Sequence, residues 1–355
     1  MIRWRRGTVG EITARRPGVI ELEVLVDGES VPALAYPEVV GSPEHGDVVL
    51  LNTTALAQGL GTGGWALVVA VPDRLPADPV GTGHLVKARY TPLQTTVLGA
   101  DEQGSPHHEL LRDTDSLDGA PVVVADLHSA LPAVLAAVFL DRPGTRVVYV
   151  MTDGGALPLW FSKTVPALRE AGWLAGSVTT GQAFGGDVET VTLHTGLLAA
   201  KHALHAELIV VTQGPGNLGT GTPWGFSGVA VGEDVNAVAV LQGRPVGALR
   251  VSGADPRERH QGVSHHAMTA FGRVALAPCD VVVPDLQGEF GARVRADAAA
   301  LSARHNLVDV SVEGLEEALR ACPVPLSTMG RGYDQDSAYF LAAAAAGRHA
   351  ASLLS

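Results

Sequence analysis

From residue 121 onward, short apolar segments alternate with longer helical ones, and this alternation constrains the fold more than any other feature. The apolar segments are nearly continuous and rich in valine, which is typical of strands buried on both faces. Strands of this kind, each followed by a helix, form a parallel sheet that helices cover on both sides. We therefore predict an α/β fold with a doubly wound, mainly parallel sheet over residues 121–355.

The elements of this domain can be placed approximately along the chain. The predicted strands lie at 122–125, 147–151, 177–180, 209–212, 246–252 and 281–284. The predicted helices lie at 131–140, 159–171, 197–206, 226–241, 265–276, 290–303 and 337–354. The helix at 226–241 has an alternative, because residues 235–241 could instead form one arm of a hairpin. The last helix is rich in alanine, and we expect it to pack on the outside of the sheet.

The first 72 residues indicate β structure of another kind. Asp27-Gly28 is a favoured hairpin turn between two apolar segments. The predicted strands lie at 19–26, 31–36, 46–52 and 65–71. Four short strands need closure or a packing partner, so residues 1–75 are predicted to form a small β-barrel or sandwich-like module. Residues 76–120 are expected to be a connector, with one or two strands within 85–98.

The composition excludes several classes of protein. The formal net charge is −12, which argues against nucleic acid or an anionic membrane surface as a partner. No apolar run reaches the roughly 20 residues needed to span a bilayer. Cys279 and Cys322 lack metal-type spacing, and so few cysteines indicate a reducing compartment. We therefore expect a cytoplasmic protein that binds no nucleic acid and no membrane.

A glycine-rich loop follows the predicted strand 209–212 and is the strongest sign of a binding site. Its G-x-G-x-x-G pattern is one in which glycine lets the backbone approach a phosphate group. A dinucleotide-binding fingerprint has its helix begin within the motif, whereas here the helix begins near residue 226. A phosphate or other anion site, a NAD site and a purely structural loop therefore stay open. The candidate binding residues of the loop are Gln213, Gly214, Gly216, Asn217, Gly219 and Thr220.

Polar residues follow the predicted strands, at the edge where open parallel sheets bind their ligands. Asp126 and His128 come after the first strand, and Asp153 comes after the second. These side chains are candidates for acid–base chemistry. The alternative is that Ser129 or Asp153 only caps the following helix.

His260, His265 and His266 lie between a predicted strand end and a helix start, with Ser264 placed to cap that helix. Adjacent histidines are not expected to face the same way on a helix. Only one of the pair should therefore join Asp126 or His128 at a metal ion, for which carboxylate and imidazole are suitable ligands. A catalytic acid or base, an anion-binding group and a surface or capping histidine are the alternatives, and the metal stays unknown.

Three cations are further candidates for holding an anion. In a continuous strand, Lys87 and Arg89 would share one face and could clamp a phosphate or carboxylate. Arg331 lies between two glycines and has room to approach an anion. The alternatives are an outward strand face paired with acidic residues, and an arginine that only ties down the last helix.

Four segments resemble an uncharacterised bacterial, actinobacterial-type family, the domain of unknown function 3866. They are GHLVKARYTPLQ at 83–94, TQGPGNLGTGT at 212–222, VSHH at 263–266 and TMGRG at 328–332. The resemblance runs from near residue 1 to the last helix. It implies no activity, substrate, cofactor or catalytic residue.

The sequence favours an enzyme that acts on a small anionic or phosphorylated molecule at the carboxyl ends of the strands. Acid and base candidates at several strand ends favour catalysis. The absence of a nucleophile elbow or a Walker sequence favours the alternative, a non-catalytic regulatory protein that binds a nucleotide or metabolite. A structural assembly protein is a third possibility, and a homo-oligomer is compatible with each. The cofactor, the substrate and the role of the N-terminal module stay open.

Overall fold

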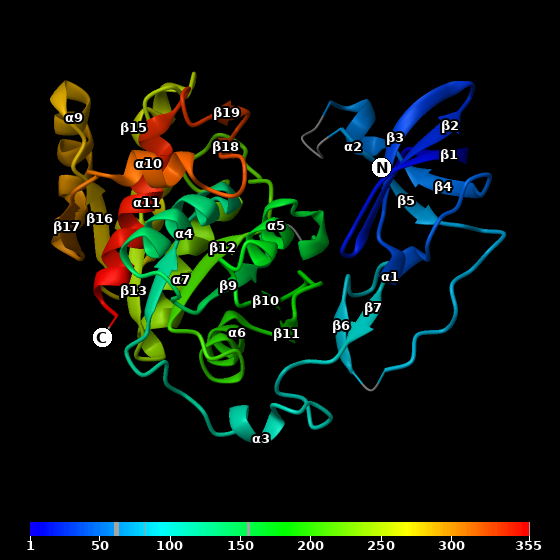
Figure 1. Ribbon diagram of the computed structural model, residues 1–355, viewed down its shortest axis with the longest axis horizontal. Helices are drawn as coiled ribbons and strands as arrows, with labels where there is room; N and C mark the ends of the chain where they lie inside the picture. Colours follow the sequence, from blue (N-terminus) through cyan, green and yellow to red (C-terminus); the bar gives the residue numbers. More distant parts are fainter. Residues whose placement is uncertain (60–63, 82, 155–156, 355) are drawn as a thin grey trace. The chain divides into compact units, whose positions relative to one another are not determined.

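The computed structural model describes residues 1–59, 64–81, 83–154 and 157–354 (Figure 1). Within this part of the chain, two compact units are present, Met1–Val97 and Leu98–Ser355. The boundary between the units falls inside the segment expected to be a connector.

The first unit contains a closed five-stranded barrel, which confirms the prediction of a small β module. Its strands are β1 (Trp4–Arg16), β2 (Val19–Val26), β3 (Glu29–Ala35), β4 (Val48–Asn52) and β5 (Ala66–Ala70), in the order β1-β2-β3-β5-β4. The prediction missed β1, whose inward-facing positions include Gly7 beside Val9. A Cβ on Gly7 would lie 2.5 Å from Val24 Cγ1. Because the barrel excludes a side chain at this position, β1 lacks the apolar alternation by which a strand is recognised.

The remaining elements of the first unit are short. They are α1 (Pro37–Val40), α2 (Thr54–Ala57) and an antiparallel pair, β6 (Leu85–Lys87) and β7 (Thr95–Val97). The prediction that Lys87 and Arg89 share a strand face is wrong, because β6 ends at Lys87 and Ala88 has a φ of 49°. Lys87 is fully buried, whereas Arg89 is exposed and lies 4.7 Å above the ring of Tyr90.

The second unit is built on an eight-stranded sheet in which every pair is parallel, as predicted. Its strands are β8 (Pro121–Val124), β9 (Val147–Thr152), β10 (Gly176–Thr180), β11 (Val188–Thr190), β12 (Leu208–Gln213), β13 (Arg244–Ala248), β16 (Asp280–Pro284) and β17 (Asn306–Val310). Their order is β11-β10-β9-β12-β8-β13-β16-β17. The prediction missed the two edge strands, β11 and β17, which are short or partly polar and lack a continuous apolar run.

Helices cover both faces of this sheet, so that it is doubly wound. One face packs against α4 (Leu131–Asp141), α5 (Thr164–Glu170), α10 (Leu315–Arg320) and α11 (Ser337–Ser352). The other packs against α6 (Leu193–Leu198), α7 (Val231–Val240), α8 (His265–Thr269) and α9 (Gly288–Ala298). Among the described residues, no helix has both the length and the apolar character that crossing a membrane requires.

Several segments differ from their predicted extent. The expected strand 246–252 divides into β13 and β14 (Val251–Ser252), and β14 pairs with β15 (Gly262–Val263). The segment 226–241 is helical and not a hairpin arm. The other short elements are α3 (His108–Leu111), β18 (Ser327–Thr328), β19 (Arg331–Gly332), the 3₁₀ helices His128–Ala130, Leu159–Phe161, Ser227–Ala230, Glu258–His260 and Ala299–Ala303, and the π-helices Ala199–Ala203 and Ala270–Val274.

The strand order creates one place suited to a ligand. Strands β9 and β12 are neighbours, but β9 leads on to β10 on one side and β12 leads across β8 to β13 on the other. Helix α5, which follows β9, and α7, which follows β12, lie on opposite faces of the sheet. Connections that leave neighbouring strands in opposite directions open a crevice at their carboxyl ends, which is where α/β proteins bind ligands.

Candidate functional site

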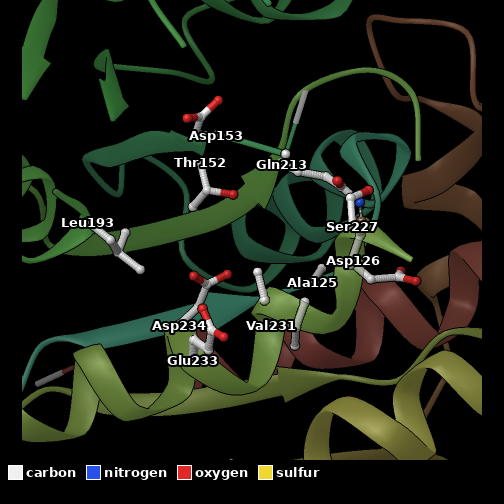
Figure 2. A pocket seen from close by; sticks show the side chains of 13 residues that line it. Ala125, Asp126, Thr152, Asp153, Leu193, Gln213, Ser227, Val231, Glu233 and Asp234 are labelled. Carbon is white, nitrogen blue, oxygen red and sulfur yellow. Dashed lines mark hydrogen bonds between the residues drawn. The ribbon is translucent and has the colours of Figure 1, made fainter. Parts of the chain in front are cut away.

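A pocket of about 330 Å³ lies at this crevice, and we call it the acidic pocket. Four carboxyl groups line it, those of Asp126, Asp153, Glu233 and Asp234. Figure 2 shows that they come from three elements: Asp126 follows β8, Asp153 follows β9, and the last two belong to the first turn of α7. Two predicted candidates, Asp126 and Asp153, are thus brought to one pocket from strands that are not neighbours.

Asp234 is the most perturbed carboxyl group of the acidic pocket. It is only 6% exposed, and burial, followed by the nearby charge of Glu233, raises its pKa to about 8. A carboxyl group in this state carries a proton near neutral pH and can donate it. The sequence did not indicate this role, because an acidic residue in the first turn of a helix is ordinarily a solvated group that stabilises the helix end.

Gln213, the last residue of β12, connects the strand ends. Its Nε2 donates a hydrogen bond of 2.6 Å to the carbonyl oxygen of Asp126. Its Oε1 is buried and has no hydrogen-bond partner among the described residues. Asp153 accepts a 2.9 Å bond from the backbone N–H of Gln182. The N-cap residue of α5 is Lys163, and it makes no side-chain capping bond. Ser129 is engaged elsewhere, with Thr328 and Tyr339.

A second, smaller pocket of about 90 Å³ is rich in arginine. We call it the arginine pocket, and it is lined by Arg250, Arg257, Arg259, His260, His266, Asn217, Gly219, Gly221 and Met329. The two pockets are adjacent. Ser227 in the acidic pocket donates a 3.0 Å bond to Asn217 in the arginine pocket. Asp126 in the acidic pocket lies 3.4 Å from a guanidinium nitrogen of Arg250.

The guanidinium groups of the three arginines differ in whether a carboxylate of the protein already pairs with them. Arg250 pairs with Asp126, and Arg257 donates two bonds, of 2.9 and 2.8 Å, to the carboxylate of Asp255. These bonds hold the pKa of Asp255 well below its ordinary value. Arg259 is exposed and makes no hydrogen bond or ion pair with any described residue. Arg259 therefore provides donors that a ligand can use.

The predicted cation Arg331 lies beside this group but is occupied. It donates bonds of 3.3 Å to Asp255 and 3.0 Å to Asp336, the residue before α11. Ser252 donates a 2.6 Å bond to the same Asp336. Arg331 thus joins β19 to the start of the last helix. Lys87 and Arg89 belong to the first unit, whereas every residue that lines the two pockets belongs to the second.

The glycine loop contributes to the arginine pocket at two of the predicted positions, Asn217 and Gly219. Asn217 Nδ2 is buried without a described partner. Gly214 instead serves packing, because a Cβ there would lie 3.0 Å from Leu157 and Met151. Gly216 has a φ of +99°, which favours glycine.

The rest of the loop turns back on itself. The N–H of Thr220 donates to the carbonyl of Gly225 at 2.7 Å, and that of Ser227 donates to Leu218 at 2.8 Å. Helical structure begins only at Ser227, eight residues after Gly219. The helix therefore does not begin within the motif, as it does in a dinucleotide-binding fingerprint.

The three predicted histidines converge at the rim of the arginine pocket. One ring nitrogen from each of His260, His265 and His266 lies within 4.8 Å of the others. The prediction that the adjacent pair cannot face the same way is wrong. His265 and His266 are the first two residues of α8, where side chains lean back over the helix start, and their ring centroids are 4.4 Å apart. Ser264 caps the helix as predicted, since its Oγ accepts the N–H of His266.

Nearby groups hold these rings in place. His260 Nδ1 lies 2.7 Å from Ser264 Oγ, and the ring of His266 stacks on Phe226 with centroids 3.7 Å apart. Burial and neighbouring arginines lower the pKa of His260 to about 3. Burial and the neighbouring His266 lower that of His265 to about 4. Both rings are therefore neutral near pH 7.

Asp126 approaches the histidines, but His128 does not. Asp126 Oδ2 lies 3.7 Å from His266 Nδ1. Burial would raise the pKa of Asp126, but Arg250 and His266 outweigh this effect and lower it. His128 is buried in the sheet layer, 3.0 Å from Tyr149 OH and 2.8 Å from Ser162 Oγ. Burial lowers its pKa to about 4, and its position is that of a packed core histidine.

The residues that sequence reasoning missed are Arg250, Arg257, Arg259 and Asp234. Arg257 and Arg259 flank His260 in the segment RERH, so their charge density was a usable signal. That these two arginines lie beside the glycine loop, some 40 residues earlier in the chain, could not be inferred from their spacing in the sequence.

The comparisons with known proteins identify a family but no activity. The family model described as "Protein of unknown function (DUF3866)" matches residues 32–347. No curated protein matches the chain.

Proposed function

The chain belongs to the DUF3866 family of proteins of unknown function, and we propose that it is an enzyme that acts on a small anionic or phosphorylated molecule. The arginine pocket holds the anionic group, and the adjacent acidic pocket provides proton transfer. The observation that carries this proposal is the convergence of Arg250, Arg257 and Arg259 with the glycine loop in one small pocket.

The arginine pocket suits an oxyanion because it offers donors that the protein leaves unused. Arg259 has no described partner, and Asn217 Nδ2 is buried without one. Charge-assisted hydrogen bonds from guanidinium to phosphate or carboxylate are short and strong. Arg250 and Arg257 add positive charge but are already paired with Asp126 and Asp255. We therefore assign the direct contacts to Arg259 and Asn217.

The acidic pocket supplies the features that favour catalysis over simple binding. A carboxyl group with a raised pKa in the same pocket as one with a lowered pKa, here Asp126, is a typical arrangement for general acid–base chemistry. Here Asp234 is the proton donor, and Asp126 and Asp153 are the candidate bases. A substrate whose anionic group lies in the arginine pocket would extend its reacting part across Asp126 into the acidic pocket.

We further propose a cytoplasmic location, as expected from the sequence. Cys279 is buried and Cys322 is partly buried, and both are free thiols. Free thiols are usual in a reducing compartment.

Binding of inorganic phosphate, measured by isothermal titration calorimetry, tests the anion site. The wild type should bind phosphate saturably, and Arg259→Gln should weaken binding at least about tenfold, since a hydrogen bond to a charged group contributes about 1.5–3 kcal/mol. Arg295→Gln is the matched control, because Arg295 is an exposed arginine that pairs with Asp285 outside both pockets. Equal affinity in the two variants would contradict the proposal.

An assay of turnover with a panel of phosphate monoesters and anhydrides distinguishes between an enzyme and a non-catalytic binding protein. For any substrate that is converted, Asp234→Asn should abolish turnover while phosphate still binds. Saturable phosphate binding without conversion of any compound in the panel would favour the non-catalytic regulatory alternative.

A further inference from the structure

We propose that His260, His265 and His266 bind one divalent transition-metal ion, with Zn²⁺ the first candidate. The site lies at the rim of the arginine pocket, which His260 and His266 both line. The inference goes beyond the proposed activity and does not require it, because it rests on the arrangement of the three rings.

The distances are close to those of a metal site. The three ring nitrogens lie within 4.8 Å of one another, whereas zinc–nitrogen bonds of about 2.0–2.1 Å place tetrahedral ligands about 3.4 Å apart. Binding a metal ion therefore requires the nitrogens to approach one another by at most about 1.4 Å.

His265 provides independent support. Its Nε2 is buried and has no hydrogen-bond partner among the described residues. Burying a polar atom without a partner costs free energy, so such atoms are rare and call for an explanation. A metal ion bound to this nitrogen removes the cost.

The surroundings of His260 match those of a ligating histidine, which commonly donates its second N–H to a neighbouring group. His260 Nδ1 lies 2.7 Å from Ser264 Oγ, so this nitrogen can donate and leave Nε2 for a metal. Asp126 Oδ2 lies 3.7 Å from His266 Nδ1. Arg250 Nη1 lies 3.2 Å from the same nitrogen and donates to it, and it also pairs with Asp126. Binding of a metal at Nε2 of His266 therefore requires the tautomer with its hydrogen on Nδ1, in which Nδ1–H faces Asp126 and Arg250 keeps only its bond to the carboxylate.

The ligand chemistry selects the class of metal. Three imidazoles suit Zn²⁺, Co²⁺, Ni²⁺ or Cu²⁺, whereas Mg²⁺ and Ca²⁺ prefer oxygen ligands. Three protein ligands also leave a coordination position open, as in catalytic zinc sites. The arginine pocket lies beside that position, so the fourth ligand is expected to be water or an oxyanion.

Zinc titration of protein first treated with a chelator tests the site. We expect one Zn²⁺ per chain, and replacement by Co²⁺ should give the visible absorption of a four-coordinate ion. His265→Ala should weaken zinc binding by at least about 100-fold, since losing even a group that only orients a ligand costs 10–100-fold. This substitution removes no described hydrogen bond of the ring, and thermal unfolding verifies that the variant folds.

His194→Ala is the matched control, because His194 is an exposed histidine on α6 outside the cluster. It should bind zinc as the wild type does. Binding below one ion per chain, or equal zinc affinity in His265→Ala and His194→Ala, would overturn the metal site. The phosphate titration on zinc-free protein is a separate readout. Phosphate binding that depends on Arg259 without one-per-chain zinc binding would therefore refute the metal site and leave the proposed function standing.

Discussion

At the scale of single residues, burial and charge determine the chemistry of the acidic pocket. Asp234 and Asp126 are both buried carboxyl groups at the carboxyl edge of the sheet. Arg250 pairs with Asp126 and lowers its pKa, whereas burial and Glu233 raise that of Asp234 to about 8. The same functional group is thus ionised at one position and protonated at the other, as an acid–base pair requires.

The protonated state of Asp234 makes stability depend on pH. Because the folded pKa is above the unfolded value, the folded protein retains a proton that the unfolded chain releases, and stability falls as pH rises from about 4 to about 8. The slope from one such group is at most about 1.4 kcal/mol per pH unit. Asp234→Asn should remove this slope in urea unfolding measured across that range.

Glu233→Gln is the control for this prediction. Glu233 precedes Asp234 on the same turn but is exposed, and its charge is the smaller cause of the raised pKa. This variant should keep most of the slope. An unchanged pH dependence in Asp234→Asn would show that Asp234 is already ionised in the folded protein.

Part of the candidate site was predictable from single residues. Polar side chains after apolar strands identified Asp126 and Asp153, and the glycine pattern identified Asn217 and Gly219, all of which line the two pockets. Arg259 and Asp234 were not predictable as site residues. An exposed arginine and an acidic residue in a helical first turn are common on any surface, and only tertiary packing makes these two different.

At the scale of elements, α11 shows why an alanine-rich helix can be central to a fold. Ala342–Ala346 are buried, and the helix packs closely on α4. Small side chains permit this close approach. The predicted helix is confirmed, but its degree of burial exceeds what packing on the outside of a sheet suggests.

A substitution at Gly347 of α11 tests the close packing of α11 on α4. Glycine to alanine in a helix interior normally gains about 0.5–1 kcal/mol. Here a Cβ would lie 2.2 Å from the carbonyl oxygen of Val134, a backbone atom that cannot rotate away. We expect Gly347→Ala to destabilise the protein by about 1–3 kcal/mol, the usual cost of overpacking. A higher midpoint of thermal unfolding in this variant would contradict the packing of α11 on α4.

There are physical reasons why some strands were predicted from the sequence and others were missed. The predicted elements were those with a strong apolar pattern, such as β9 and β12, which are buried along their length. The missed strands lack that pattern: β1 has glycine where the barrel is tight, and β17 alternates with polar residues at the sheet edge. An apolar sequence pattern reflects the burial of the side chains of a strand. Strands that bury few apolar side chains are therefore hard to predict from sequence.

At the scale of the whole molecule, the fold class was predictable but the strand order was not. Alternating strands and helices imply a parallel sheet, and the hairpin signals imply a separate β module, and both are present. The order β9-β12-β8, however, places a late strand between two early ones. This interleaving brings Gln213 to Asp126 and creates the crevice, so the site could be expected at this edge but not assembled from the sequence.

The proposed function requires above all that an oxyanion binds in the arginine pocket. The most direct test is a crystal structure of the protein grown with selenate, whose anomalous scattering locates the ion without ambiguity. We predict a selenate peak within hydrogen-bond distance of Arg259 and Asn217, and its loss in Arg259→Gln. Selenate bound only elsewhere on the protein, with the arginine pocket empty at saturating concentration, would contradict oxyanion binding at this pocket.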